Sequence, residues 1–233
     1  MWRPAPFLVL ALGGLATGAA PAQEARRGSQ SGGSVTPSST EDGRLWFDPT
    51  QLPSFTGVVE RYLLNPEGKI DRLLFREGPQ IILPGPVGSE VARKIEPGQS
   101  IVVWGIRARK APVIIMLAWA KDTNAKPRFV ERPSWGIGAY RSGQQEVEVS
   151  GQIVAPLYTP QGDSMGVILQ DGMVIRLPPS IAEFMGDRLT VGREIAASGR
   201  GVSGEHGRAV DAERVGDNLA ALGPLPGSAE KRP

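Results

Sequence analysis

Short apolar runs, each ended by glycine or proline, follow one another along most of the 233-residue chain. Within many runs apolar and polar positions alternate, which is the pattern of a strand with one buried face. The break at Asn65-Pro66-Glu67-Gly68 is typical, because proline fixes φ and glycine tolerates positive φ in a turn. The pattern predicts strands at 56–64, 70–76, 80–83, 100–107 and 113–120, with a short helix at 89–95. It predicts further strands at 152–158, 165–170, 173–177, 194–199 and 208–215, with a short helix at 180–186.

These two sets of elements are copies of one another. Residues 57–105 align with residues 151–199 at a constant offset of 94 without a gap, and 11 of the 49 positions are identical. Seven of the identical residues are Gly or Pro, the residue types that fix turn geometry. The sequence therefore predicts a duplicated domain.

The order of the elements within each copy indicates a fold. Three strands, a short helix and two further strands make up the OB-fold, a five-stranded Greek-key barrel. Gly and Pro together supply 51 of 233 residues, which favours strands and turns over a helical bundle. The predicted fold class is all-β: two tandem small five-stranded OB-fold-like Greek-key barrels, each with one short helix.

Three segments carry a resemblance to a family. FDPTQLP at 47–53, GVVERYLLNP at 57–66 and RLPP at 176–179 resemble uncharacterised exported OB-fold proteins of proteobacteria. The likeness covers residues 46–216, and Pro84-Gly85-Pro86 replaces the Pro-Pro dipeptide of that pattern. The resemblance implies tandem OB-like repeats and export. It implies no established activity, since "nucleic-acid-binding" in the family's name comes from OB-folds in general.

The first residues are typical of a secretory signal. A basic start precedes a nine-residue apolar run at 7–15 and an Ala-Pro-Ala site at 20–22. The run is shorter than the roughly 20 residues that span a bilayer; a buried helix or an uncleaved anchor is the alternative. We expect a periplasmic or secreted protein without a membrane span. The predicted segments are a signal peptide at 1–22, a disordered leader at 23–45, repeat 1 at 46–120, a linker at 121–147, repeat 2 at 148–216 and a disordered tail at 217–233.

Candidate catalytic chemistry is sparse. The chain has no Cys and one His, which excludes disulfides, thiolate metal sites and multi-histidine metal sites. His206 is expected at a hairpin tip, where nothing positions it as a general acid or base. Acidic residues alternate with basic ones along the strands, as on a solvated sheet face. We therefore expect no catalytic residues, no metal, no cofactor and no enzymatic activity.

The predicted binding residues lie on the surface that OB-folds use, the outer face of strands two and three and the loops beside it. Strand alternation places Arg72, Arg76 and Arg176 on this face, and Arg107, Arg109 and Lys110 in the adjoining loop of the first copy. These residues would suit a phosphate, an acidic polysaccharide or an acidic protein surface; a solvated loop is the alternative. Neither face offers the aromatic platforms that bind single strands tightly.

The two halves also differ in charge, with +3 over 55–120, +2 over 121–147 and −3 over 148–216. This asymmetry favours attraction between the repeats or an acidic partner for the first. Leu74 and Ile82, and likewise Ile168 and Val174, are apolar on the outer face, and the large apolar and aromatic linker residues Phe129, Trp135, Ile137 and Tyr140 favour burial on a barrel. We therefore expect the repeats to pack together.

The expected function is an exported, non-catalytic binding or scaffold protein with an unknown protein or an anionic polymer as its partner. The alternative is a protein that binds nucleic acid or anionic polymers weakly. Salt would separate the two, because polyanion binding weakens steeply as ionic strength rises.

Overall fold

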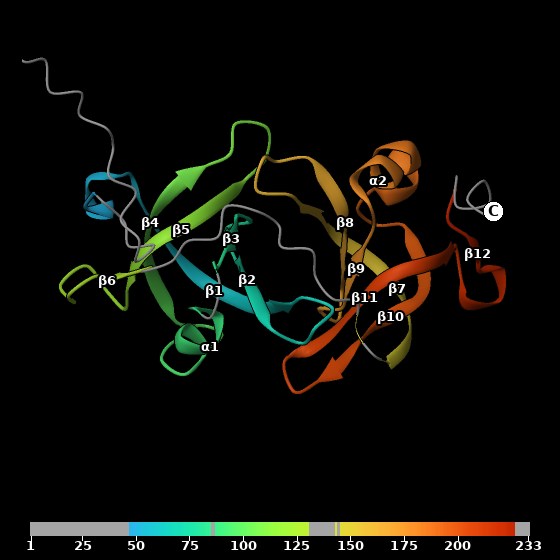
Figure 1. Ribbon diagram of the computed structural model, residues 1–233, viewed down its shortest axis with the longest axis horizontal. Helices are drawn as coiled ribbons and strands as arrows, with labels where there is room; N and C mark the ends of the chain where they lie inside the picture. Colours follow the sequence, from blue (N-terminus) through green and yellow to red (C-terminus); the bar gives the residue numbers. More distant parts are fainter. Residues whose placement is uncertain (1–46, 85–86, 131–142, 144, 227–233) are drawn as a thin grey trace, which may run out of the picture. The chain divides into compact units, whose positions relative to one another are not determined.

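Repeat 1 is built around β1 (Ser54–Leu64), whose two halves pair with different neighbours. Its N-terminal half pairs with β4 (Ser100–Arg107), and its C-terminal half pairs with β2 (Ile70–Phe75). β3 (Gln80–Ile82) pairs antiparallel with β2 and parallel with β5 (Val113–Ala120), which closes a five-stranded barrel. The computed structural model describes residues 47–84, 87–130, 143 and 145–226, and its element order is drawn in Figure 1. The remaining elements of repeat 1 are the 3-10 turn η1 (Pro49–Gln51), α1 (Val87–Ala92) and β6 (Arg128–Phe129).

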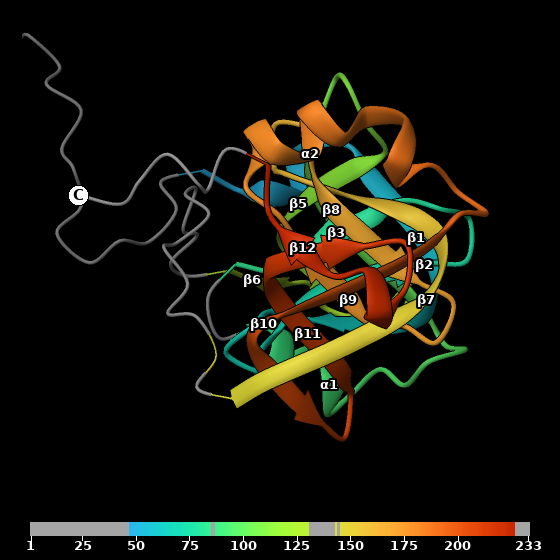
Figure 2. The same cartoon turned by 90° about the vertical axis from the view of Figure 1, so that its right-hand side faces the viewer.

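Repeat 2 has the same connections. β9 joins β8 on one side and β11 in parallel on the other, while β10 joins both β7 and β11. Figure 2 views this barrel from the side of β10, β11 and β12. Its elements are β7 (Gln145–Tyr158), β8 (Ser164–Leu169), β9 (Val174–Arg176), α2 (Pro179–Met185), η2 (Gly186–Leu189), β10 (Glu194–Gly204), β11 (Gly207–Gly216), η3 (Leu219–Ala221) and β12 (Gly223–Pro224). The predicted fold class is confirmed: the chain forms two tandem OB-fold-like barrels.

The two barrels share their strand register. Val59 pairs with Phe75 in repeat 1, and Ile153 pairs with Leu169 at the same offset of 94 in repeat 2. Even the bulge before Gly105 recurs before Gly199. A Cβ at Gly105 would lie 2.0 Å from the Ile115 carbonyl oxygen, and one at Gly199 would lie 2.0 Å from the Asp211 carbonyl oxygen. Only glycine fits at these bulges, which explains its recurrence in both copies.

Each repeat also carries a sixth strand that the pattern did not predict. β6 pairs Arg128 with Trp119 on β5, and β12 pairs Gly223 with Val215 on β11. The predicted disordered tail is therefore wrong over its first part, where η3 and β12 form and Leu225 packs on the second core.

The predicted packing of the linker holds for β6 and Val130, but the expected burial of Phe129 is wrong, because its side chain on this edge strand is 52% exposed. β6 lies on β5, and Val130 is buried and donates its N–H to the Leu117 carbonyl. The expectations for Trp135, Ile137 and Tyr140, like those for the signal peptide and leader, lie outside the described residues.

The hydrophobic core links the two repeats, which belong to one compact unit. One cluster fills barrel 1 and takes in residues of repeat 2, among them Leu157, Ile168 and Val174. A second cluster fills barrel 2. Leu74, which strand alternation places on the outer face of repeat 1, is also buried. The prediction that the repeats pack together is confirmed. Among the described residues, no helix is long and apolar enough to cross a membrane.

Candidate functional site

Arg72 on β2 lies in the contact between the repeats. Its side chain is 1% exposed, and its Nη1 donates to the Tyr158 carbonyl of repeat 2 at 2.5 Å. Its Nη2 lies 3.5 Å from the Met165 sulfur on β8. This arginine therefore holds the end of β7 rather than facing solvent.

Gln80 on β3 adds two hydrogen bonds to the same strand. Its Nε2 donates to the Pro156 carbonyl at 2.7 Å, and its Oε1 accepts from the Tyr158 N–H at 3.3 Å. The Gln80 amide thus pairs with a carbonyl and an N–H group at the end of β7, as the backbone of a neighbouring strand would. Such bonds align two barrels as well as stabilise them, because each depends on the register of the partner backbone.

Arg176 on β9 makes the reciprocal contact from repeat 2. It is 2% exposed, and its Nη2 lies 2.6 Å from Asp71 Oδ2 of repeat 1. Asp71 Oδ1 also lies 3.9 Å from Arg72 Nε, so one carboxylate stands between the two buried arginines. The carboxylate offsets the charge of the guanidinium groups where water is excluded.

The loops beside these faces contact each other in a reciprocal way. Gly68, in the β1–β2 turn of repeat 1, packs on Val202 of β10, while its counterpart Gly162 packs on the Lys110–Ala111 segment of the β4–β5 loop. At one side, the Tyr62 ring meets the His206 ring edge-to-face with centroids 5.4 Å apart. In each repeat, the first turn is held against the last hairpin of the other repeat.

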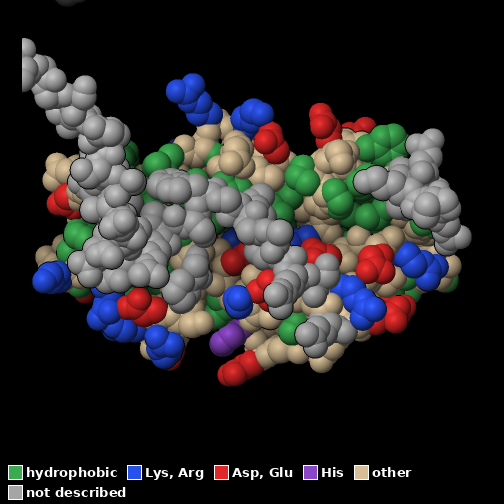
Figure 3. Space-filling view, viewed as in Figure 1, with side chains coloured by type: hydrophobic (Ala, Val, Ile, Leu, Met, Phe, Trp, Pro, Cys, Tyr) green, Lys and Arg blue, Asp and Glu red, His purple; other side chains and the backbone are tan. Residues whose placement is uncertain are grey.

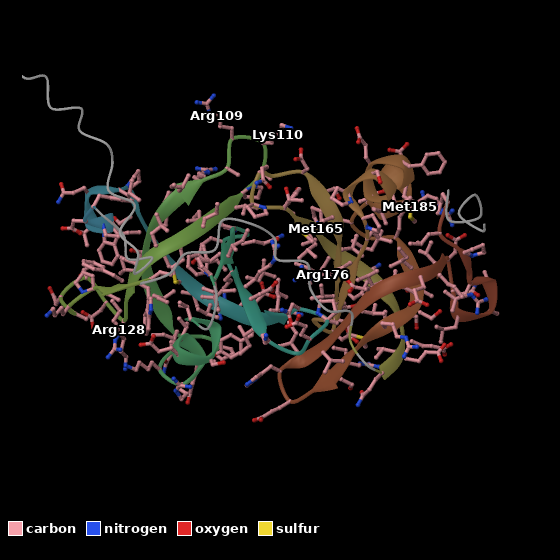
Figure 4. All side chains as sticks on the ribbon, in the orientation of Figure 1. Arg109, Lys110, Arg128, Met165, Arg176 and Met185 are labelled. Atoms are coloured by element: carbon pink, nitrogen blue, oxygen red, sulfur yellow. The ribbon has the colours of Figure 1, made fainter. Side chains whose placement is uncertain are left out.

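The sequence-predicted site residues therefore separate into two groups. The expectation that Arg72 and Arg176 face solvent is wrong, because the outer faces of strands two and three cover one another. Arg76 is exposed in the β2–β3 turn, and Arg107 and Arg109 are exposed at the β4–β5 connection. Figure 4 shows Arg109 pointing outward from that loop and Arg176 at the contact between the barrels.

Lys110 differs from its exposed neighbours because it has a partner. Its Nζ lies 2.8 Å from Asp163 Oδ1 in the β7–β8 turn of repeat 2. The hydrogen bond and charge of Asp163 raise the pKa of Lys110. This ion pair and the Arg176–Asp71 pair run in opposite senses across the contact. Each repeat therefore gives one cation and one anion to these two pairs, and the pairs do not neutralise the difference in net charge between the halves.

Burial at the contact also affects two tyrosines. Desolvation raises the pKa of Tyr62 and of Tyr158 above the ordinary tyrosine value, and the charge of Glu96 adds to the rise at Tyr62. Tyr62 donates its hydroxyl to the Ile95 carbonyl. Both phenols stay protonated at physiological pH and act as structural groups.

A basic pocket of about 410 Å³ lies in repeat 1, formed by elements that do not take part in the contacts above. Lys94 comes from the segment after α1, Trp119 and Ala120 from the end of β5, and Arg128 from β6. The β5–β6 loop supplies Lys121, Ala125 and Lys126. Figure 3 shows basic side chains gathered where α1 and β6 lie, and Figure 4 labels Arg128 there.

Local hydrogen bonds shape this pocket. Asp122 Oδ1 accepts the N–H groups of Asn124 and Ala125 at 2.8 and 2.9 Å, which folds the loop into a turn between its two lysines. The β5–β6 pairing sets Arg128 beside Trp119, and the guanidinium lies 5.8 Å from the centroid of the indole ring. Such a cation–π contact helps to fix the arginine.

The charge of this pocket is only partly balanced. Glu90 on α1 lies 2.6 Å from Arg128 Nη1 and 3.9 Å from Lys94 Nζ. Lys121 and Lys126 have no ion pair with any described residue. Four cations thus line the cavity, and among the described residues Glu90 forms ion pairs with two of them. A concave surface of one sign concentrates oppositely charged ligands.

The equivalent place in repeat 2 is built differently. Arg188 stands at the position of Lys94, and it forms an ion pair with Asp217 at 3.1 Å. Asp217 follows β11 as Lys121 follows β5, and Val215 takes the place of Trp119 on the inner strand. Gly216 lies so near the Ala221 carbonyl that an added Cβ would be 2.4 Å from its oxygen. Chain packing and an ion pair therefore occupy the place where repeat 1 has a cationic pocket.

Sequence reasoning placed most of these pocket residues in a linker and did not combine them. Lys94 and Arg128 come together only because β6 returns along β5, and a two-residue strand leaves no hydrophobic pattern. The basic residues at 121, 126 and 128 were the available signal.

No family model and no curated protein matches this chain. Within the described residues, no group of three or more His, Cys, Asp or Glu side chains could hold a metal ion.

Proposed function

We propose that this protein is an exported, non-catalytic binding protein in which the two repeats form a scaffold and the basic pocket of repeat 1 holds an anionic ligand. Export is inferred from the signal-like sequence at residues 1–22. The binding role follows from the pocket, and the scaffold role follows from the polar and apolar contacts between the repeats.

One observation carries the proposal: equivalent places in the two copies of one fold differ in charge, with a neutral ion pair in repeat 2 and a cluster of cations in repeat 1. In repeat 2, Arg188 and Asp217 neutralise each other. In repeat 1, Lys94 and Lys121 are both basic, and Lys126 and Arg128 join them around a cavity. Four like charges repel one another, so an anion is the ligand that would stabilise this arrangement.

The covered faces argue for the same conclusion. Ligands of OB-folds usually bind the face of strands two and three. Here that face is committed to the contact between the repeats, with Arg72, Gln80 and Arg176 buried. The nucleic-acid alternative thus loses its customary surface. Trp119 is only 2% exposed and offers no ring for a base to stack on.

A thermal-shift screen of the purified full chain tests this proposal. Anions of several classes, namely phosphates, small carboxylates and polyglutamate, are compared at constant ionic strength, since a ligand that binds only the folded state raises Tm. We expect at least one class to stabilise the protein. That shift should be reduced in a variant with Lys121→Ala and Lys126→Ala.

Lys69→Ala is the matched control, because Lys69 is an exposed lysine of the same repeat in the β1–β2 turn. Its Tm response should equal that of the wild type. A screen in which no anion stabilises the protein, or in which both variants respond as the wild type does, contradicts the proposal. A short single-stranded DNA should bind no more tightly than nonspecific contacts allow, about 10⁻⁴–10⁻⁶ M.

A further inference from the structure

We infer that the basic pocket of repeat 1 selects a small anion with several phosphate groups, rather than a carboxylate or a nucleic-acid strand. This inference rests on the proposed function and assigns the chemistry of its ligand. Three features of the pocket carry it: the state of its arginine, the origin of its lysines and its size.

The arginine is already committed. Arg128 Nη1 lies 2.6 Å from Glu90, and the guanidinium lies over the Trp119 ring at 5.8 Å from its centroid. Planar carboxylates are recognised best by the two-pronged donor fork of an arginine. Because Glu90 already holds Nη1, a ligand carboxylate would have to displace Glu90 to bind both terminal nitrogens of the guanidinium.

The other cations of the pocket are lysines: Lys121 and Lys126 have no ion pair with any described residue, and Lys94 Nζ lies 3.9 Å from Glu90. Lys94, Lys121 and Lys126 reach the cavity from the segment after α1 and from both ends of the β5–β6 loop. An ammonium group is a compact charge with three donors that can turn, and lysine binds phosphate in this manner. Ammonium groups from separate backbone positions match an anion whose oxygens point in several directions. Linked phosphate groups have that shape and carry the multiple charge that the site would neutralise.

The dimensions favour a small molecule over a polymer. The volume of about 410 Å³ lies within the range of small-molecule sites, about 300–1,000 Å³. Tight single-strand binders add aromatic rings on which bases stack, whereas here Arg128 lies over Trp119, which is 2% exposed. The pocket therefore suits the phosphate groups themselves and offers no place for a base.

Isothermal titration of the full chain with tripolyphosphate, pyrophosphate, orthophosphate and tricarballylate, at constant ionic strength, tests this inference. We expect one tripolyphosphate per chain and an affinity that falls in the order tripolyphosphate, pyrophosphate, orthophosphate. Tricarballylate, a small tricarboxylate, should bind more weakly than tripolyphosphate. Replacing Lys121 and Lys126 by Ala should weaken tripolyphosphate binding about tenfold or more, as expected when hydrogen bonds to charged groups are lost. Lys69→Ala should leave it unchanged.

Glu90→Gln provides a second variant that does not depend on losing a lysine. It removes the carboxylate that pairs with Arg128 and Lys94, so tripolyphosphate should bind several-fold more tightly while tricarballylate gains at least as much. Far-UV circular dichroism and thermal unfolding verify that each variant is folded.

The possible outcomes are distinct. If tricarballylate binds as tightly as tripolyphosphate and both depend on the lysines, the phosphate inference is overturned and the proposed function stands. If a short oligonucleotide binds more tightly than tripolyphosphate, the pocket belongs to a nucleic-acid surface and the inference is also overturned. If no anion binds, or if the lysine variant binds as the wild type does, both proposals fail.

Discussion

The two repeats of this chain agree in backbone and differ in side chains where they meet. Their strands pair in the same register at an offset of 94. Arg72 of repeat 1 nevertheless corresponds to Gly166 of repeat 2, and Gln80 corresponds to Val174. If the two repeats had identical sequences, a self-complementary contact between them would bring an arginine of one repeat close to the same arginine of the other. The duplicated chain instead sets Arg72 and Gln80 of repeat 1 against backbone groups of β7, while Arg176 of repeat 2 pairs with Asp71 of repeat 1.

The sixth strands, β6 and β12, also agree in backbone while the side chains beside them differ. Both repeats add a two-residue strand to the last strand of the barrel. The connecting loop leads to a cationic pocket in repeat 1 and to an ion pair in repeat 2. Duplication has kept the turns and bulges that the fold requires, while side chains at equivalent places have taken separate roles.

The largest expected effect comes from Arg72→Ala, which breaks the contact at its most buried charge. The substitution leaves the Tyr158 carbonyl without its Arg72 donor and removes one of the two arginines beside Asp71. We expect a loss of about 3 kcal/mol in the free energy of unfolding, typical of removing one partner from a buried charged network. Urea unfolding measures it, with the exposed Arg76→Ala as the control. Equal stabilities of the two variants would mean that the contact does not depend on Arg72.

Lys121→Asp converts the pocket to the arrangement of repeat 2. The new carboxylate would face Lys94 as Asp217 faces Arg188. Tripolyphosphate affinity should fall about a hundredfold, because a like charge beside the anion costs several kcal/mol. The reverse change, Asp217→Lys, should create no site, since the Ala221 backbone packs against Gly216 there. Unchanged affinity in Lys121→Asp would place the anion elsewhere.

Gln80→Leu tests the neutral part of the contact. It removes the hydrogen bonds to Pro156 and Tyr158 and leaves those partly buried backbone groups without their side-chain partner. We expect a loss of about 2 kcal/mol in the free energy of unfolding. Lys110→Ala breaks an exposed ion pair in the same contact and should change stability little, less still at high salt. A larger effect for Lys110 than for Gln80 would reverse this ranking.

The smallest effect concerns alkaline pH. Burial raises the folded-state pKa of Tyr158 above the ordinary 10.0, so the folded state keeps the phenol protonated where the unfolded state ionises. Its contribution to stability is complete below pH 10 and is lost as pH rises through the folded-state pKa. Tyr158→Phe should therefore lose stability less steeply than the wild type above that pH. Parallel pH profiles from urea unfolding would contradict this.

The sequence was sufficient for much of this architecture because turn formers carry strong local signals. Gly105 and Gly199 recur where a bulge excludes any side chain, so the duplication could be read without a structure. Strand alternation also set Leu74, Arg72 and Arg176 on the outer face. Strand alternation alone does not predict that this face is covered, because its burial depends on how the two barrels pack against each other. The apolar residues on that face were the signal that favoured packing over binding.

The pocket could not be predicted, because its cations approach through strand pairing that has no local pattern. Two-residue strands such as β6 and β12 form because a neighbouring strand edge accepts them. Lys94 and Arg128 consequently read as separate surface charges in the sequence.

Residue-resolved NMR of the full chain, titrated with tripolyphosphate, tests the central claim most directly. The claim is that repeat 1 has acquired an anion site that repeat 2 lacks. Backbone amide shifts should change at Lys94 and along 119–128, and stay constant at Arg188 and along 215–223. Equal changes in both repeats, or changes confined to the exposed arginines of the β4–β5 loop, would contradict the claim.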